Sequence, residues 1–161
     1  MLRAAAWAGG LTREQLERVE LEPQDRFYSA GEIGCHKVSA ATHWIGIVEG
    51  MVKVEVLSAD GRSTTLTGVT NGGWLGEGSV LKGELRPYVV VALRDTRIAL
   101  MPSQTFHCLV ANSLGFCHFM IDQLNARLGQ FIAQAESFRM HDISSRVAGC
   151  MAELFNPQLN P

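Results

Sequence analysis

Seven apolar residues near the end of the chain recur at intervals that alternate between four and three positions. Such a heptad repeat makes a narrow stripe on one side of a helix, which is typical of a helix that pairs with another helix. The sequence therefore predicts a long dimerisation helix from Leu114 onward, in which two copies of the chain bury one another's stripe in a parallel, two-fold dimer. The stripe consists of Cys117, Ile121, Leu124, Leu128, Phe131, Ala135 and Phe138.

The first two turns of this predicted helix carry additional apolar side chains. Phe116, Phe119 and Met120 widen the stripe there, so we expect these turns to pack against the preceding part of the chain. The alternative for the stripe as a whole is that it packs only against its own chain, without a partner.

Residues 26–101 show a different periodicity, with short strands separated by glycine-rich turns. Val52, Val54 and Val56 alternate with Lys53 and Glu55, which is the pattern of a strand with one buried and one exposed face. A hairpin is expected at residues 60–61, where Asp-Gly tolerates positive φ. Strands are predicted over residues 45–48, 51–57, 62–69, 88–93 and 96–101, and the last two are expected to pair with each other.

About eight strands at this spacing favour a rolled or closed body, because closure removes unpaired strand edges. We therefore expect a mainly β (α+β) fold: a double-stranded β-helix or jelly-roll barrel with a short N-terminal helix and the long C-terminal dimerisation helix. The N-terminal helix is predicted over residues 12–21, where Thr12 and Gln15 can form a capping box. A last helix is predicted over residues 143–155 behind an Asp142 N-cap, with Ile143, Val147, Cys150, Met151 and Leu154 on one face.

Composition limits the possible functions. A net charge of −2 and a pI of about 6.2 disfavour DNA binding by this chain alone, because phosphate contacts need basic surfaces. The four cysteines are widely spaced and are expected to be free thiols in a reducing cytoplasm. No segment approaches the roughly 20 apolar residues of a membrane span. A cytoplasmic protein without a membrane partner is expected.

Enzymatic and metal chemistry find little support in the residues. A cupin-type metal site needs a His-x-His pair, and no two of the five histidines are separated by one residue. No serine, cysteine or aspartate stands in a nucleophile motif such as G-x-S-x-G. An iron–sulfur sensor needs clustered N-terminal cysteines, but Cys35 alone precedes residue 100, and a haem on His43 is less expected than a structural histidine. We expect no catalytic residue and no metal site.

Five stretches and the long helix together resemble the Crp/Fnr family of bacterial transcription regulators. The stretches are residues 27–32, 48–54, 73–79, 91–95 and 142–148. The resemblance implies a sensor domain similar to cyclic-nucleotide-binding domains at residues 1–112, the dimerisation helix at 113–140, and the beginning of a helix-turn-helix DNA-binding domain at 141–161. The rest of that DNA-binding domain, through which the family contacts DNA, is expected to be missing from this chain.

The resemblance also implies a phosphate-binding cassette. Its candidate ligand-binding residues are Gly76, Glu77, Gly78, Ser79 and Arg86. A helical turn after a glycine presents backbone N–H groups to an anion, an arginine adds a fork of donors, and a glutamate can accept from a ribose hydroxyl. A cyclic nucleotide or another small anionic ligand would bias the helix pair and so control DNA binding in the full-length family; no other cofactor is expected.

Three departures from the family pattern keep an alternative open. Pro87 follows Arg86 where the cyclic-AMP binders have serine or threonine, and the loop before Arg86 is about one residue short. The helix positions that in the family offer hydroxyls to the purine carry the apolar Phe131 and Ile132 here. The alternative is a binding or assembly module whose degenerate pocket takes no cyclic nucleotide. In that case Glu77, Gly78 and Arg86 would form only a turn with a surface salt bridge.

Overall fold

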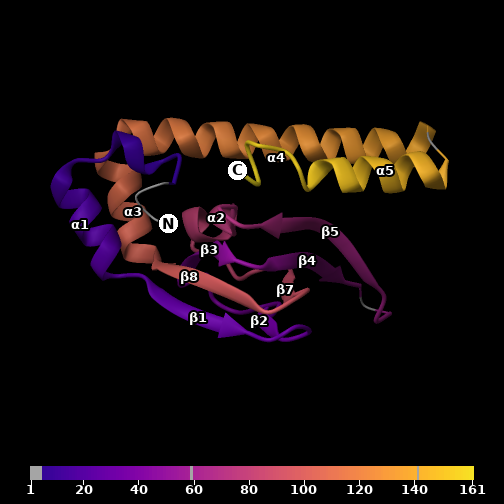
Figure 1. Ribbon diagram of the computed structural model, residues 1–161, viewed down its shortest axis with the longest axis horizontal. Helices are drawn as coiled ribbons and strands as arrows, with labels where there is room; N and C mark the ends of the chain where they lie inside the picture. The colour runs from indigo at the N-terminus through magenta and orange to yellow at the C-terminus, as the bar shows by residue number, and fades with distance from the viewer. Residues whose placement is uncertain (1–4, 59, 141) are drawn as a thin grey trace.

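The computed structural model describes residues 5–58, 60–140 and 142–161 as a rolled β-barrel with helices along one side (Figure 1). The long helix α4 (Leu114–Met140) runs over the barrel, and α5 (Ile143–Glu153) returns beside its second half. The remaining helices are η2 (Ala8–Gly10), α1 (Arg13–Leu21), α2 (Glu77–Lys82) and α3 (Ser103–Asn112). No described helix is long and apolar enough to cross a membrane.

Eight strands form two antiparallel sheets, as the predicted jelly roll requires. One sheet has the order β1-β8-β3-β6 and the other the order β2-β7-β4-β5. The strands are β1 (Gln24–Tyr28), β2 (Ile33–Cys35), β3 (His43–Glu49), β4 (Met51–Leu57), β5 (Ser63–Thr70), β6 (Trp74–Leu75), β7 (Val89–Ala92) and β8 (Thr96–Pro102). The predicted fold class is confirmed.

One predicted strand pairing is wrong. We expected residues 88–93 and 96–101 to form a hairpin, but β7 pairs with β2 and β4, whereas β8 pairs with β1 and β3. The two strands therefore belong to different sheets. The short connection between them turns from one sheet to the other at the rim of the barrel, and spacing along the sequence cannot distinguish such a corner from a hairpin.

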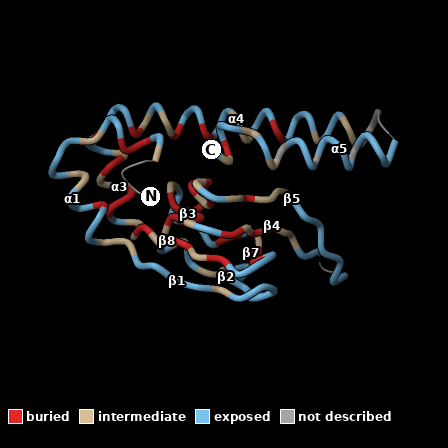
Figure 2. Tube along the Cα trace, in the orientation of Figure 1, coloured by how far each residue is buried: buried red, intermediate tan, exposed pale blue. Residues whose placement is uncertain are grey.

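The sheet that contains β3 and β6 has a hydrophobic core on each face. Ile45 and Ile47 point into the barrel, whereas Trp44 points to the helices on the other side. The same division separates Leu75 from Trp74 in β6. Figure 2 shows buried positions in the middle of the barrel and in the adjoining parts of α3 and α4. Such a double-sided strand explains why residues 44–47 are all buried and show no simple alternation.

Aromatic rings build the second core. Trp44 and Trp74 are stacked, with ring centroids 4.0 Å apart, and Trp7 meets Trp74 edge to face at 5.4 Å. Phe106 of α3 and Phe116 of α4 pack edge to face against Trp44. The N-terminal segment, β3, β6, α3 and the first turns of α4 are thus joined through one aromatic cluster.

The helix predictions are largely confirmed. Thr12 and Gln15 form the expected capping box at α1, and Asp142 accepts a hydrogen bond from the Ser145 N–H at the start of α5. Helix α5 ends at Glu153, two residues before the predicted end. The Cys150 side chain, which we placed on its apolar face, lies outside the described residues.

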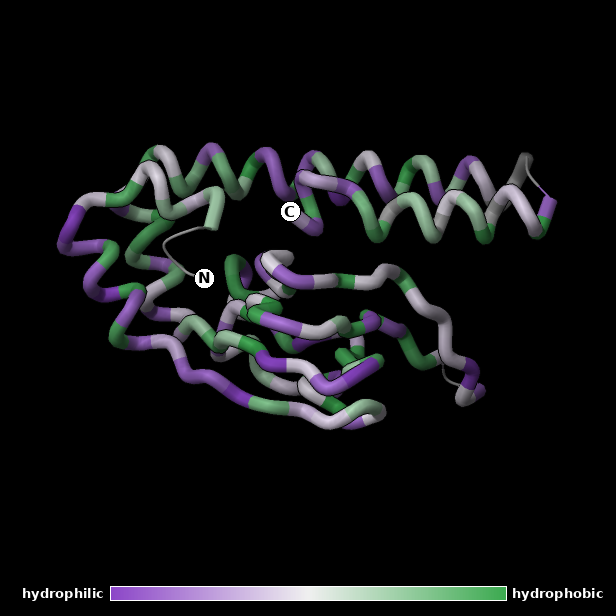
Figure 3. The backbone as a smooth tube through the Cα atoms, viewed as in Figure 1, coloured by the Kyte–Doolittle hydropathy of each residue, from purple (hydrophilic) through white to green (hydrophobic). Residues whose placement is uncertain are grey.

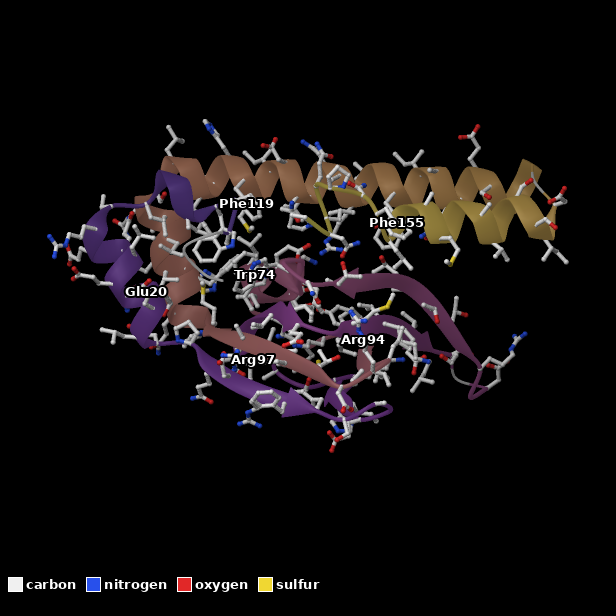
Figure 4. All side chains as sticks on the ribbon, in the orientation of Figure 1. Glu20, Trp74, Arg94, Arg97, Phe119 and Phe155 are labelled. Carbon is white, nitrogen blue, oxygen red and sulfur yellow. The ribbon has the colours of Figure 1, made fainter. Side chains whose placement is uncertain are left out.

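Helix α4 presents two different faces. Its first turns pack into the aromatic cluster through Phe116 and Met120, with Phe119 against its edge, as predicted (Figure 4). The heptad stripe, in contrast, is largely uncovered: the exposed fractions are 54% for Ile121, 40% for Leu124, 58% for Leu128 and 40% for Phe131. Cys117 is partly buried, Ala135 is exposed, and the Phe138 side chain lies outside the described residues. The alternative that this stripe packs on its own barrel is wrong for these four large side chains.

Gly46 limits what β3 can carry beside the tryptophan stack. A methyl group at this position would lie 2.8 Å from Cζ2 of Trp74, which cannot retreat without opening the stack on Trp44. We expect Gly46→Ala to lower the free energy of unfolding by about 1–3 kcal/mol, measured by urea unfolding followed by circular dichroism. Gly129→Ala is the matched control, because its added methyl group meets nothing within 4 Å in α4. A neutral Gly46→Ala variant would contradict this packing.

Candidate functional site

The predicted cassette lies between β6 and β7. Gly76 adopts φ +89°, a left-handed conformation that favours glycine, and helix α2 follows it at once. A Cβ atom at Gly76 would also overlap the Arg86 guanidinium and lie 2.9 Å from the Tyr88 hydroxyl. Glycine is therefore required here both by the backbone and by the close approach of two polar side chains.

Arg86 is buried beneath this turn, with an exposed fraction of 3%. Its Nη1 donates to the Tyr88 hydroxyl at 3.1 Å, and its Nη2 donates to the backbone carbonyl oxygen of His43. A buried guanidinium is stable only when its donors find acceptors, and these two bonds provide them. The alternative of a surface salt bridge is wrong, because Arg86 is buried and Glu77 pairs with a different arginine.

Glu77 opens α2 and is 5% exposed. Its Oε1 lies 2.6 Å from Nε of Arg127 in α4, and the same guanidinium donates through Nη2 to the carbonyl oxygen of Trp74. The second carboxylate oxygen, Oε2, is buried and has no hydrogen-bond partner among the described residues. A buried acceptor without a donor is unfavourable, so this oxygen is suited to receive a hydroxyl or N–H from a ligand.

The remaining cassette residues lie on the same short helix. Ser79 is buried and interacts with the Tyr88 hydroxyl. Gly78 is half-buried, and a Cβ atom there would meet nothing within 4 Å. The structure therefore places Gly76 against Arg86 and Ser79 against Tyr88, whereas the carboxylate of Glu77 pairs with Arg127. Ligand binding by these residues stays a prediction.

Two titratable groups next to Arg86 have shifted pKa values. Burial raises the pKa of the Tyr88 phenol above its ordinary value, although Arg86 and Ser79 partly oppose this effect. Burial, together with the positive charges of Arg86 and Arg26, lowers the pKa of His43. Both shifts favour neutral side chains beside the buried Arg86.

A row of polar side chains on α4 faces the barrel. Gln130 donates to Oγ1 of Thr67 at 3.0 Å, and Gln134 donates to the carbonyl oxygen of Leu66 at 3.2 Å, both in β5. Gln123 donates to the carbonyl oxygen of Gln158 in the C-terminal segment. Arg127, Gln130 and Gln134 hold the second half of α4 to the barrel through hydrogen bonds, whereas its first half is held mainly by apolar packing.

Metal ligands do not gather in the part of the chain that the structure describes: no group of three or more His, Cys, Asp or Glu could hold an ion there. Cys35, Cys108 and Cys117 are free thiols. The site is described by its charged and hydrogen-bonding groups.

Residues 25–113, more than half of the chain, match the family model described as the cyclic nucleotide-binding domain. The chain belongs to the cyclic nucleotide-binding domain family. A comparison with curated protein sequences found no match.

Solved structures share the fold of this cyclic nucleotide-binding domain. A protein assigned to the Crp/Fnr family of transcriptional regulators, from Eubacterium rectale, has a TM-score of 0.79 at 16% identity, covering 90% of this chain and 68% of that one. The sensor domain of the transcriptional regulator DNR from Pseudomonas aeruginosa has a TM-score of 0.71 at 14% identity over 82% of this chain and 89% of that one. The catabolite activator protein of Thermus thermophilus has a TM-score of 0.69 at 20% identity over 83% of this chain. This chain spans 63% of the Thermus protein.

Sequence reasoning missed two residues of this cyclic nucleotide-binding domain. Arg127 was placed off the apolar stripe without a role, and Tyr88 was treated only as part of a strand. A signal for the first existed: residues 116, 120, 123, 127, 130 and 134 repeat the four-and-three spacing one position before the stripe. Nothing comparable marks Tyr88, whose role depends on where β7 brings its hydroxyl.

Tyr88 gives the domain a defined dependence on alkaline pH. Because the folded-state pKa lies above the ordinary phenol value of 10.0, the stability from the neutral phenol is fully present below pH 10 and is lost as pH rises through the raised value. We expect urea unfolding to show this decline in the natural chain and in Tyr28→Phe, but not in Tyr88→Phe. At neutral pH Tyr88→Phe should cost about 1–3 kcal/mol, because Nη1 of Arg86 loses its acceptor. An unchanged alkaline decline in Tyr88→Phe would contradict the assignment.

Proposed function

We propose that this domain is the ligand-sensing, dimerising effector module of a Crp/Fnr-type transcription regulator, and that it is not an enzyme. The observation that carries the proposal is the buried Glu77, whose second carboxylate oxygen has no partner among the described residues, on the turn whose Gly76 lies against buried Arg86. This arrangement suits a cyclic nucleotide or a similar small anion. Arg86 would donate hydrogen bonds to its phosphate, and Glu77 would accept a hydrogen bond from its hydroxyl. The proposed ligand residues are Gly76, Glu77, Gly78, Ser79 and Arg86.

The route from the ligand to the helix runs through Arg127. This arginine joins Glu77 of the cassette to α4 over 2.6 Å, so a ligand that bonds to Glu77 changes the environment of its guanidinium. Such a ligand favours one position of α4 over another only if its contacts differ between them, and the Glu77–Arg127 pair supplies that difference. The hydrogen-bonded second half of α4 can shift with less loss of packing than its apolar first half.

The output of the module rests on dimerisation through the exposed heptad stripe of α4. Four large apolar side chains along one helix face favour burial against a second copy. In the full-length family a helix-turn-helix domain follows this helix, and DNA binding is proposed to occur through it, with residues 141–161 at its start. The free cysteines agree with a cytoplasmic location.

A second function is favoured by the Tyr88 hydroxyl. This hydroxyl already binds Nη1 of Arg86 at 3.1 Å, and Pro87 offers no backbone N–H between them. The phenol thus stands where a ligand oxygen would bind, and the module would then serve assembly without a nucleotide.

Isothermal titration with cyclic AMP and cyclic GMP distinguishes these functions. The sensor proposal expects saturable binding that Arg86→Gln weakens at least about tenfold, since a charge-assisted bond is lost. Arg97→Gln is the matched control, because Arg97 is half-exposed on β8 and pairs with Asp25. Circular dichroism serves to check that both variants are folded. Binding that appears only in Tyr88→Phe, or in no variant, would overturn the nucleotide-sensing proposal and favour the assembly module.

Dimerisation is tested by a pair of neighbouring substitutions. Leu128 belongs to the stripe and is 58% exposed in the single chain, whereas Gly129 is one position beyond it. We expect Leu128→Lys to raise the dimer dissociation constant at least about a hundredfold, because two lysines would replace two buried leucines. Gly129→Lys should leave the constant within a few fold. Sedimentation velocity over a concentration series measures both, and a natural chain that stays monomeric would contradict the dimer.

A further inference from the structure

A second concave site lies away from the cassette, between α5 and the outer face of the sheet that contains β4 and β5. Its cavity measures about 970 Å³ and is open to solvent. One wall is formed by Met51 and Leu66 of the sheet and by Leu93 just after β7, and another by α4. The third is formed by Val147 and Met151 of α5 and by Leu154 at its C-cap. This volume is at the upper end of the range for small-molecule sites, and the walls come from three separate elements.

The lining is mainly apolar. Figure 3 shows hydrophobic positions recurring along the side of α5 that faces the barrel. Val147 and Met151 line the cavity but are 57% and 55% exposed. The sheet beneath α5 therefore does not bury the apolar face of this helix. At the far end of α5 the contact is close, because a Cβ atom at Gly68 would lie 2.5 Å from Cδ2 of Leu154. The helix is therefore anchored near Leu154 and leaves a hydrophobic groove beside Val147 and Met151.

One charge lies in this lining. Lys53 is the only charged residue among the described residues of the cavity wall, and its Nζ lies 2.5 Å from Oε2 of Glu55. Because an ammonium group has three N–H donors, Lys53 can also donate to the carboxylate of a ligand. Thr65, Thr67, Gln134 and Ser137 add polar groups to the same cavity.

We propose that this groove binds a small amphipathic carboxylate, with an acyl or aryl body against Val147, Met151 and Leu66 and its carboxylate at Lys53. A second copy of the chain fits the groove less well, since the long exposed stripe of α4 is the surface with a self-complementary heptad pattern. A bound ligand would contact both α5 and the sheet, so it would hold α5 against the barrel. This site is separate from the cassette and does not depend on a nucleotide.

Displacement of the fluorescent dye 1-anilinonaphthalene-8-sulfonate from the full chain tests the proposal. Decanoate and its neutral counterpart decan-1-ol serve as competitors, both below the concentrations at which they aggregate. We expect both competitors to displace the dye. We also expect Lys53→Met to weaken the binding of decanoate about fivefold while leaving the binding of decan-1-ol unchanged. Glu55→Gln should strengthen the binding of decanoate, because a competing carboxylate is removed from Lys53.

A substitution at Gly149 can fill the groove with a side chain without disturbing its walls. Gly149 lines the cavity on α5, and an added Cβ atom would meet nothing within 4 Å. Gly149→Phe should therefore weaken dye and decanoate binding at least tenfold, whereas the neighbouring exposed Ala148→Phe should leave both unchanged.

Three results would overturn the proposal. The first is equal binding by Gly149→Phe and the natural chain, and the second is an equal effect of Lys53→Met on the acid and on the alcohol. The third is dye emission per chain that rises on dilution, because a second copy would then occupy the groove. None of these results depends on whether the cassette binds a nucleotide.

Discussion

Helix α4 has two parallel rows of side chains, offset by one residue, and its contacts with the barrel depend on this offset. The row at Gln123, Arg127, Gln130 and Gln134 forms hydrogen bonds to the cassette, to β5 and to the C-terminal segment. The row at Ile121, Leu124, Leu128 and Phe131 stays uncovered. If the helix rotated by one position, apolar side chains would meet polar strand edges and the glutamines would face solvent. The polar row therefore fixes which face remains available to a partner.

This arrangement also joins the cassette to the helix by two different kinds of contact. The first turns of α4 are fixed in the aromatic cluster with Trp44 and Phe116, where displacement would expose large rings. Farther along, the contacts are hydrogen bonds, which contribute individually only about 0.5–1.5 kcal/mol net. The Glu77–Arg127 pair lies at the transition between these two regimes. In the function proposed above, a change at α2 acts on the hydrogen-bonded part of α4, with the aromatic cluster as its fixed end.

Sequence patterns predicted the elements of the fold better than their connections. Alternation in β4, the Thr12–Gln15 cap and the heptad stripe are local signals, because each depends on residues a few positions apart. The placement of β7 and β8 in different sheets was missed because it depends on a corner of the barrel that has the spacing of a hairpin. The burial of all residues from Trp44 to Ile47 follows from helices that cover the second face of β3, which no strand pattern reveals.

Family resemblance predicted which residues form the candidate site, but not which hydrogen-bond partners they have. Gly76 and Ser79 lie close to Arg86 and Tyr88, yet the partner of Glu77 comes from 50 positions away, and Arg86 is bonded to a tyrosine two positions along. The first partnership depends on how α2 and α4 lie relative to one another, and the second on the directions of two side chains on one segment. The polar row of α4 was visible as a periodic pattern, but its significance depended on the edge of β5 being the surface it meets.

The aromatic cluster has an optical consequence. All three tryptophans of the chain lie in it, and each is at most 3% exposed. The intrinsic emission of the protein therefore originates at a single place, where the N-terminal segment, the barrel and α4 meet. Arg127 contacts the main chain of Trp74 there, so a displacement of this guanidinium would alter the electric field at the indoles. The chain thus contains its own spectroscopic label at the joint between its barrel and its long helix.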